Sequence, residues 1–421
     1  MFKEIYQEDL SFKFICLLLC ILPLAIVTSS AIMNLVVILI TLIFIIIIFK
    51  NKEFQVLNNS PFIFLCFFYI YLLLNLKNSF DIDNSLSRTI GFIRYLLLPF
   101  AISYVLTFKN FKYSKLILIS WLCIFIIVSI DLFYEFIFGQ NLIGYSNQFP
   151  GRLSSFLNDE LKIGGYYYGF IILSLATIFY FFSKKLGIFF TIIFLSISIL
   201  IGERSNFIKI FLSLIIFFLF MDIFSKKIKL LTLTISLVTI LFLINSNKNL
   251  DARFNNQFIG YISDNNIYKY YKISQYGAHY NSAIEIIKDY TFFGIGFKNF
   301  FDVCFDDKYT DKSFNIFEPD MRCSTHPHQT HLDILLSVGL FGYLFLISIF
   351  IYFLIISIKS YKKNKNLFTL AGICFVLTTF ITPLPAGSFF TSYGATIFWI
   401  NIGILFSFKN MPLKILKDSI R

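Results

Sequence analysis

The sequence predicts an all-α polytopic membrane protein with about twelve transmembrane helices, and three observations lead to this fold class. Hydrophobic residues make up 57% of the 421 residues and charged residues only 14%, whereas a soluble domain carries roughly 25% charged residues. The mean hydropathy of the chain is +0.76. The apolar residues also form long runs, and many of these approach the roughly 20 residues that a helix needs to cross a bilayer.

Twelve apolar runs follow one another along the chain. They cover residues 11–29, 31–49, 60–76, 87–107, 115–138, 164–182, 185–202, 206–223, 228–246, 331–358, 366–384 and 391–408. The first run follows Lys3 and Lys13, as the apolar core of a signal peptide would. It lacks a small-residue cleavage site and a second run follows at once, so we expect it to be retained as a span.

Lysine and arginine are distributed unevenly between the links that join these runs. Links after even-numbered runs are basic, as in Lys184-Lys185 and Lys226-Lys227, whereas short links after odd-numbered runs carry few basic residues. Basic links favour the cytoplasmic side of a membrane. The pattern therefore predicts a cytoplasmic position for both termini, and it explains the net charge of +12 without a nucleic-acid partner.

The longest polar segment, residues 247–330, falls on the extracytoplasmic side in this topology. It is not of low complexity, and residues 282–289 have the pattern of a short amphipathic helix. Acidic and basic residues are nearly balanced in it, which favours a folded unit over a disordered linker. We therefore predict three parts: nine spans in residues 1–246, a loop subdomain in residues 247–330, and three spans with a cytoplasmic tail in residues 331–421.

The cysteines support the same assignment of sides. Five lie in apolar runs, where a small buried hydrophobic side chain is expected: Cys16, Cys20, Cys66, Cys123 and Cys374. Cys304 and Cys323 are the only two in the large loop, and such a pair in an oxidising compartment predicts a disulfide, with two free thiols as the alternative. The closed loop of roughly 20 residues would gain about 3 kcal/mol of stability.

Three of the four histidines, His326, His328 and His331, lie within six positions where the large loop meets the tenth run. Histidine is the usual general base near neutral pH. Three readings are open: a metal site, a structural cluster, or one catalytic histidine. Pro327 separates the first two histidines and no acidic ligand pattern lies nearby, which disfavours a metal. His328, just past the proline, is the favoured catalytic residue.

Arginines on the same side form a second group of candidates. Arg204 lies in the link Gly202-Glu-Arg-Ser205, Arg152 lies in the segment 151–156, and Arg94 lies in the outer half of the fourth run. Ionisable residues within or beside a span are functional candidates by default, and the guanidinium group suits bidentate capture of phosphate. For Arg94, contact with lipid headgroups is the alternative reading.

Several motifs occur in an order that resembles the O-antigen ligase and polymerase superfamily. These are Gly294-Ile-Gly-Phe297, His326-Pro-His-Gln329, Leu332-Asp-Ile-Leu-Leu336 and Gly339-Leu-Phe-Gly342. Gly202-Glu-Arg-Ser205 is similar to a link between spans in that family, and the segment from Arg152 through Glu160 to Tyr166 is similar to the preceding loop. The resemblance covers residues 150–345. Two features depart from the family pattern: Gln329 stands where Asn is usual, and no arginine lies near His279, where Arg253 or His279 itself would substitute.

The resemblance implies an integral membrane glycosyltransferase with a helical bundle of the GT-C type in the bacterial inner membrane. Such an enzyme transfers a glycan from undecaprenyl diphosphate to an acceptor sugar hydroxyl, on lipid A-core or on a growing polysaccharide, at the periplasmic face. It needs no metal, nucleotide sugar or other cofactor. Carried onto this chain, His328 and Arg204 are catalytic, and Arg152, Arg94 and Arg253 bind the diphosphate. His326, His331, Gln329 and Glu160 support the site.

Other functions remain open at this stage. A protein O-oligosaccharyltransferase of the same superfamily would use the same donor chemistry. A polysaccharide or lipid flippase would also have about twelve spans, but its charges would line a central cavity. An intramembrane metalloenzyme is disfavoured by the histidine spacing. Ligase and polymerase share the donor and differ only in the acceptor, which the sequence does not reveal.

Overall fold

The computed structural model describes residues 9–146, 149–158, 160–260, 271–272, 274–309 and 322–409. Within these ranges the chain is almost entirely helical, and β structure is limited to two isolated bridges. The first half contains α2 (Leu10–Thr28), α3 (Ser30–Asn51), α4 (Ser60–Asn75), α5 (Ile82–Gly91), α6 (Ile93–Phe111), α7 (Ser114–Phe138) and α8 (Ile163–Phe181). The second half contains α9 (Lys184–Leu200), α10 (Arg204–Phe220), α11 (Lys226–Ser246), α17 (Thr330–Asn364), α18 (Leu367–Ile381) and α19 (Ser392–Phe408).

Each of the twelve predicted runs coincides with helix in the structure. The fourth run contains the end of α5 and most of α6, which are separated only by Phe92. Eight helical segments of the described chain are long and apolar enough to cross a membrane. The other four, α9, α10, α18 and α19, are 15 to 17 residues long. The prediction of an all-α polytopic membrane protein is confirmed.

The bundle is packed around α8, in which almost every residue is buried. This helix contacts α7, α9, α10, α18 and α19. Large apolar side chains are exposed on the outer faces of other helices, among them Leu42, Ile46, Phe67, Leu230 and Phe242. Exposed apolar surface of this extent is unfavourable in water but is what the hydrocarbon of a bilayer requires.

The long helix α17 is interrupted at Gly339, whose φ of 66° and ψ of −177° are not helical. Gly294 (φ 73°) lies against the same break, and a side chain at either glycine would collide with backbone atoms of the other segment. The segment around Gly294 supplies the missing hydrogen bonds: Leu340 N–H donates to the Thr291 carbonyl at 2.8 Å, and Ile295 N–H donates to the Leu336 carbonyl at 2.7 Å. Buried non-helical backbone is therefore satisfied, as membrane depth demands.

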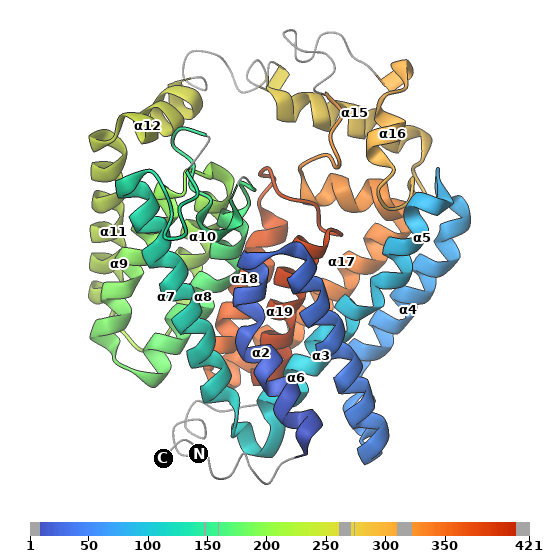
Figure 1. Cartoon of the computed structure of the whole chain (residues 1–421), viewed down its shortest axis with the longest axis horizontal. Helices are drawn as coiled ribbons and strands as arrows, with labels where there is room; N and C mark the ends of the chain where they lie inside the picture. The colour runs from blue at the N-terminus through green and yellow to red at the C-terminus, as the bar shows by residue number, and fades with distance from the viewer. Residues whose placement is uncertain are drawn as a thin grey trace.

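Short elements cover one end of the bundle, here called the loop end. They are α12 (Lys248–Asp251), the π-helix η4 (Ala252–Gly260), α15 (Gln275–Asp289) and α16 (Phe300–Cys304). Figure 1 shows α12 above α9 and α11 on one side, and α15 and α16 above α17 and α5 on the other. Helix α15 begins seven residues before the predicted helix at 282–289.

The second half of the loop end has a small hydrophobic core separate from that of the bundle. It is formed by Ala283, Ile286, Ile295, Phe300, Val303, Cys304, Tyr309 and Leu336. Leu336 comes from α17, so this core also seats the loop on the bundle. The predicted boundaries at 247 and 330 remain predictions, and residues 261–270, 273 and 310–321 of that segment lie outside the described residues.

Candidate active site

The turn that leads into α17 carries two of the candidate histidines. It is held by the segment after α18: Gln329 pairs with Pro385 in an isolated bridge, and Ala386 N–H donates to the His328 carbonyl at 2.8 Å. The side chain of Gln329 caps the helix by accepting from Leu332 N–H at 2.7 Å. The cap satisfies a backbone donor that the first helical turn leaves open. Gln329 thus fixes the turn in front of α17.

His328 adopts a left-handed backbone conformation, with φ of 54°. Residues other than glycine rarely do so, and such strain persists where the surrounding structure imposes it, often at functional sites. The bridge at Gln329 and the bonds that Ala386 N–H and the Tyr280 hydroxyl donate to the His328 carbonyl hold the backbone here.

Three imidazole rings come together at the loop end, but they are not the three that the sequence groups. The ring centroid of His328 lies 4.0 Å from that of His326 and 5.2 Å from that of His279 on α15. His331 lies apart, inside α17. Its Nε2–H donates to the Phe380 carbonyl at 2.7 Å, so its Nδ1 accepts from the Tyr343 hydroxyl at 2.9 Å. Both nitrogens of His331 are therefore occupied by structural bonds.

The three clustered rings are neutral at pH 7 because their surroundings disfavour the charged form. Burial, together with the neighbouring rings, lowers the pKa of His328 to about 3 and that of His326 to about 4. Burial also lowers the pKa of His279. His279 Nδ1–H donates to the Arg322 carbonyl at 2.7 Å, which leaves Nε2 of the neutral ring unprotonated.

In the described part of the chain, no three His, Cys, Asp or Glu side chains are arranged to hold a metal ion. The Nε2 of His328 lies 3.1 Å from the Ser324 hydroxyl, and the Nδ1 of His326 lies 3.0 Å from the Thr325 hydroxyl. The expectation that no metal takes part in the reaction remains a prediction.

Acid is expected to loosen this histidine cluster. Unfolded histidine binds a proton near pH 6.5, whereas His328 in the folded state resists protonation down to about pH 3. Between these values the unfolded segment binds more protons, so stability falls as pH falls; at pH 5 the loss is roughly 2 kcal/mol for His328 alone. Hydrogen exchange of α15 and the histidine turn at pH 7 and pH 5, corrected for intrinsic rates, measures this change. His328→Asn should reduce the pH dependence, and an unchanged dependence would contradict the argument.

A disulfide joins Cys304 of α16 to Cys323, with a Cα–Cα distance of 5.6 Å. Arg322, the residue directly before Cys323, is buried, and its guanidinium donates to the Cys304 carbonyl. The Arg322 carbonyl accepts from His279. The disulfide is therefore connected to the histidine cluster through one residue.

Removing this disulfide is expected to destabilise the loop end and lower activity indirectly. The bond closes a segment with a sequence separation of 19, for which chain entropy gives about 3 kcal/mol. Cys304→Ser should raise hydrogen exchange in α15 and α16 while the bundle helices stay protected. Cys66→Ser, in α4 and far from the loop end in sequence, is the matched control. Equal protection of α15 and α16 from hydrogen exchange in the two variants would contradict a stabilising role of the disulfide at the loop end.

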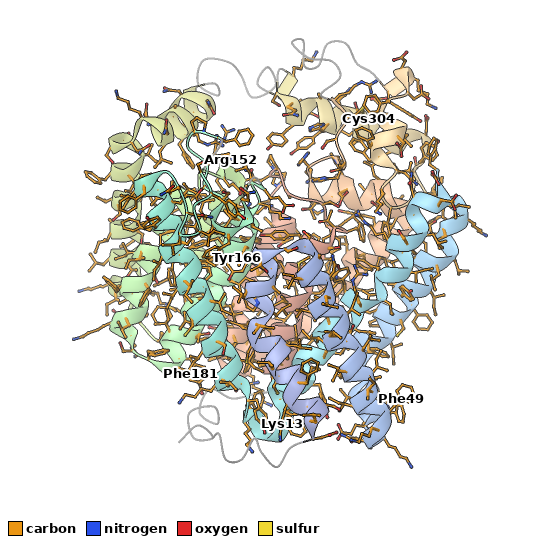
Figure 2. All side chains as sticks on the ribbon, viewed as in Figure 1. Lys13, Phe49, Arg152, Tyr166, Phe181 and Cys304 are labelled. Atoms are coloured by element: carbon orange, nitrogen blue, oxygen red, sulfur yellow. A yellow bond between two sulfur atoms is a disulfide. The ribbon has the colours of Figure 1, made fainter. Side chains whose placement is uncertain are left out.

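Three arginines gather on the other side of the loop end, near α12 and α10. Arg253 donates from Nε to the Gly202 carbonyl at 3.0 Å, and Arg204 donates to the Gln257 carbonyl at 3.2 Å. Arg152, labelled in Figure 2, donates to the Leu161 carbonyl at 2.9 Å. These carbonyl bonds orient the guanidinium groups.

One carboxylate, Glu203, accompanies the three arginines. It lies 3.7 Å from Arg152 and is largely buried. Burial raises its pKa, while Arg152 acts in the opposite direction. Burial and the nearby charges of Arg152 and Arg204 lower the pKa of Arg253 to about 10. Among the described residues, this group therefore combines three guanidinium groups with the carboxylate of Glu203.

A glycine contact and two buried acids hold the Arg152 segment in place. Gly202 (φ 74°) packs so closely against the Gly151 carbonyl that a side chain there would clash. On α7, Glu135 accepts from Ser154 N–H at 3.0 Å and Ser155 N–H at 2.7 Å. Asp131, also on α7, accepts from Leu142 N–H at 2.7 Å and from the Ser155 hydroxyl. Sequence analysis missed these two acids, although two carboxylates four residues apart in an apolar run are a recognisable signal.

Tyr276, at the start of α15, packs beside the histidine cluster. Its ring centroid lies 5.8 Å from that of His328. The loop end therefore carries both a cationic group and a neutral base group, supplied by segments far apart in the chain.

Two further predicted site residues are Arg94 and Glu160. Arg94 donates to the Gly91 carbonyl at 2.7 Å, to Asn34 Oδ1 at 3.1 Å and to the Tyr95 hydroxyl at 2.9 Å, so its guanidinium is engaged between α6 and α3. Glu160 is half exposed and pairs with Lys162. Whether either contacts substrate remains a prediction.

Comparison with known proteins identifies one region of the chain. Residues 187–347 match the family model described as O-antigen ligase. The match includes Arg204, Arg253, His279, His326 and His328, and leaves Arg152 outside. No curated protein matches the chain.

Proposed function

We propose that this chain transfers a glycan from undecaprenyl diphosphate to a sugar hydroxyl, because residues 187–347 match the family model described as O-antigen ligase. The observation that carries the proposal is that an arginine group and a neutral histidine cluster lie at the same end of a membrane bundle. A lipid-linked donor carries its diphosphate at the surface of the membrane, and on this proposal the loop end lies at that surface.

The arginine group suits the diphosphate of the donor. As the glycosidic bond breaks, negative charge grows on the leaving diphosphate, and preoriented cations stabilise it most in the transition state. Arg204 and Arg253 are already oriented by carbonyls, so little reorganisation is needed on binding. One guanidinium group can also donate two parallel hydrogen bonds to two oxygens of a phosphate. On this account arginines supply the charge that a metal ion supplies in other transferases.

The histidine cluster suits activation of the acceptor. A sugar hydroxyl attacks the anomeric carbon, the bond from that carbon to the diphosphate oxygen breaks, and the hydroxyl proton passes to His328. The ring must be neutral to accept this proton, and the pKa of about 3 keeps it so. Negative charge of the bound diphosphate raises the pKa of a nearby base, which moves His328 toward the range useful for catalysis. His279 packs beside the ring and its tautomer is fixed by Arg322.

The loop end faces the periplasm in this proposal. In Figure 2, Lys13, Phe49 and Phe181 lie at the end of the bundle opposite Arg152 and Cys304. The basic links of the sequence follow the helices that contain Phe49 and Phe181, and such links favour the cytoplasm. The disulfide at the loop end suits an oxidising compartment.

A strain that lacks this chain tests the proposal and identifies the acceptor. Single repeat units on lipid A-core would indicate a polymerase, and polymer left on the carrier lipid would indicate a ligase. Loss of glycan from proteins alone would indicate an oligosaccharyltransferase. Unchanged surface glycans in the strain would contradict the proposal. Complementation with His328→Asn, checked for normal insertion, controls for loss of the protein itself.

A further inference from the structure

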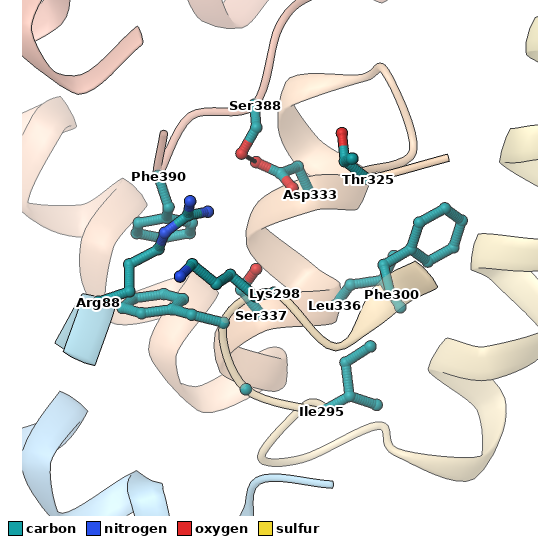
Figure 3. A pocket seen from close by; sticks show the side chains of 12 residues that line it. Arg88, Ile295, Lys298, Phe300, Thr325, Asp333, Leu336, Ser337, Ser388 and Phe390 are labelled. Carbon is teal, nitrogen blue, oxygen red and sulfur yellow. Dashed lines mark hydrogen bonds between the residues drawn. The ribbon is translucent and has the colours of Figure 1, made fainter. Parts of the chain in front are cut away.

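A polar pocket adjoins the histidine turn, apart from the three arginines. It is small, with about 20 Å³ of free volume, and lies between α5, the segment 295–300, α17 and the segment after α18. Its polar lining consists of Arg88, Lys298, Thr325, Asp333, Ser337 and Ser388. Figure 3 shows the charged ends of Arg88 and Lys298 on one side of this pocket, and Asp333 joined to Ser388 on another.

The pocket carries more positive than negative charge. Within the described residues, neither Arg88 nor Lys298 has a hydrogen-bond or ion-pair partner. Asp333 is buried, and one of its oxygens already accepts from the Ser388 hydroxyl at 2.9 Å and from Phe389 N–H at 2.8 Å. The Asp333 carboxylate therefore interacts with Arg88 through space without binding it directly. Two cations with open donors remain available to an anion.

The pocket is connected to the catalytic group through Thr325. The Thr325 hydroxyl lies 3.0 Å from Nδ1 of His326, whose ring packs against His328. Nε2 of His326 is buried and has no hydrogen-bond partner in the described structure. Buried polar groups are normally paired, so a hydroxyl of a bound molecule would supply the missing partner.

We propose that this pocket binds an acidic substituent, a carboxylate or phosphate, on the acceptor glycan. The inference rests on the proposed function, and it names the acceptor as acidic. Arg88 and Lys298 would contact the anion, Ser337 and Thr325 would bond to neighbouring hydroxyls, and the acceptor hydroxyl would lie toward His326 and His328. Neutral acceptors would leave two cations unpaired and would bind more weakly.

Binding of methyl glucuronide, with methyl glucoside as the uncharged match, tests the proposal. The purified full chain is studied in nanodiscs of phosphatidylcholine. We expect glucuronide to bind more tightly than glucoside, and Arg88→Gln and Lys298→Gln each to weaken it by about tenfold or more, as loss of a charge-assisted bond predicts. Lys288→Gln removes an exposed charge on α15 and is the matched control. Retained thermal stability shows that a variant is folded.

Several results would overturn the proposal. Equal binding of the two sugars, or equal binding by Arg88→Gln, Lys298→Gln and the parent chain, contradicts an acidic subsite. Loss of glucuronide binding in nanodiscs with phosphatidylglycerol would show that the pocket holds a lipid headgroup instead. Because these measurements do not depend on transfer, glucuronide binding without any glycan transfer would refute the proposed function and leave the anion site standing.

Discussion

Replacing His328 by Asn is expected to reduce glycan transfer by roughly 10²- to 10⁴-fold, the usual contribution of a general base. Asn tolerates the left-handed backbone of this position better than Ala does. The variant therefore removes the imidazole while keeping the turn that Gln329 and Ala386 hold. The measurement is the transfer rate at saturating donor, together with donor affinity. The rate should fall and the affinity should change little.

His328→Ala provides a comparison for this prediction. It removes the same ring but adds backbone strain, so it should lose stability as well as activity. If His328→Asn retains more than a tenth of the parent rate, His328 is not the base. His326→Asn and His279→Asn would then test whether one of these two histidines is the base instead, because their ring centroids lie 4.0 Å and 5.2 Å from that of His328.

Replacing Arg204 by Gln is expected to have the second largest effect, a loss of about 10²- to 10³-fold in turnover, comparable to removing one donor from an oxyanion site. Arg204→Lys should restore only part of the rate, because an ammonium group lacks the planar pair of donors. Donor affinity should also fall, and more so at low salt than at high salt, because ions screen the attraction. Product formation at several donor concentrations separates the two effects.

Arg94→Gln is the informative comparison for Arg204. Its guanidinium already bonds to Asn34 and Tyr95 between two helices, so its replacement should lower thermal stability and leave donor affinity almost unchanged. Equal losses of donor affinity in both variants would contradict the assignment of the diphosphate to the group formed by Arg152, Arg204 and Arg253.

The helices could be predicted from the sequence because each depends on a local property, a run of apolar residues near the length of a bilayer span. The break in α17 was not predicted, although its motif was noticed. Gly339 is non-helical because Phe292 and Gly294 insert against it, and that contact joins residues more than 40 positions apart. The start of α15 was also predicted too late, since Tyr276 and His279 are polar residues that pack only in the folded loop end.

The candidate site could be predicted only in part for the same reason. His326 and His328 were found by their spacing, but His331 is turned into the bundle by the helix that starts at Thr330. His279 reaches the cluster from another helix. Arg88 and Arg94 lie close in sequence, yet Phe92 separates their helices, and only Arg88 lines the pocket. Side chains in a polar loop carry no local sign of what they contact.

The most direct test of the central claim is a transfer assay with purified protein in liposomes. The assay contains an undecaprenyl-diphosphate-linked glycan and an acceptor glycan, a chelator, and no nucleotide sugar. The account predicts that each new glycosidic linkage releases one molecule of undecaprenyl diphosphate, and that His328→Asn prevents both. Linkage without release of the diphosphate, or linkage that requires a nucleotide sugar or a divalent metal, would contradict it.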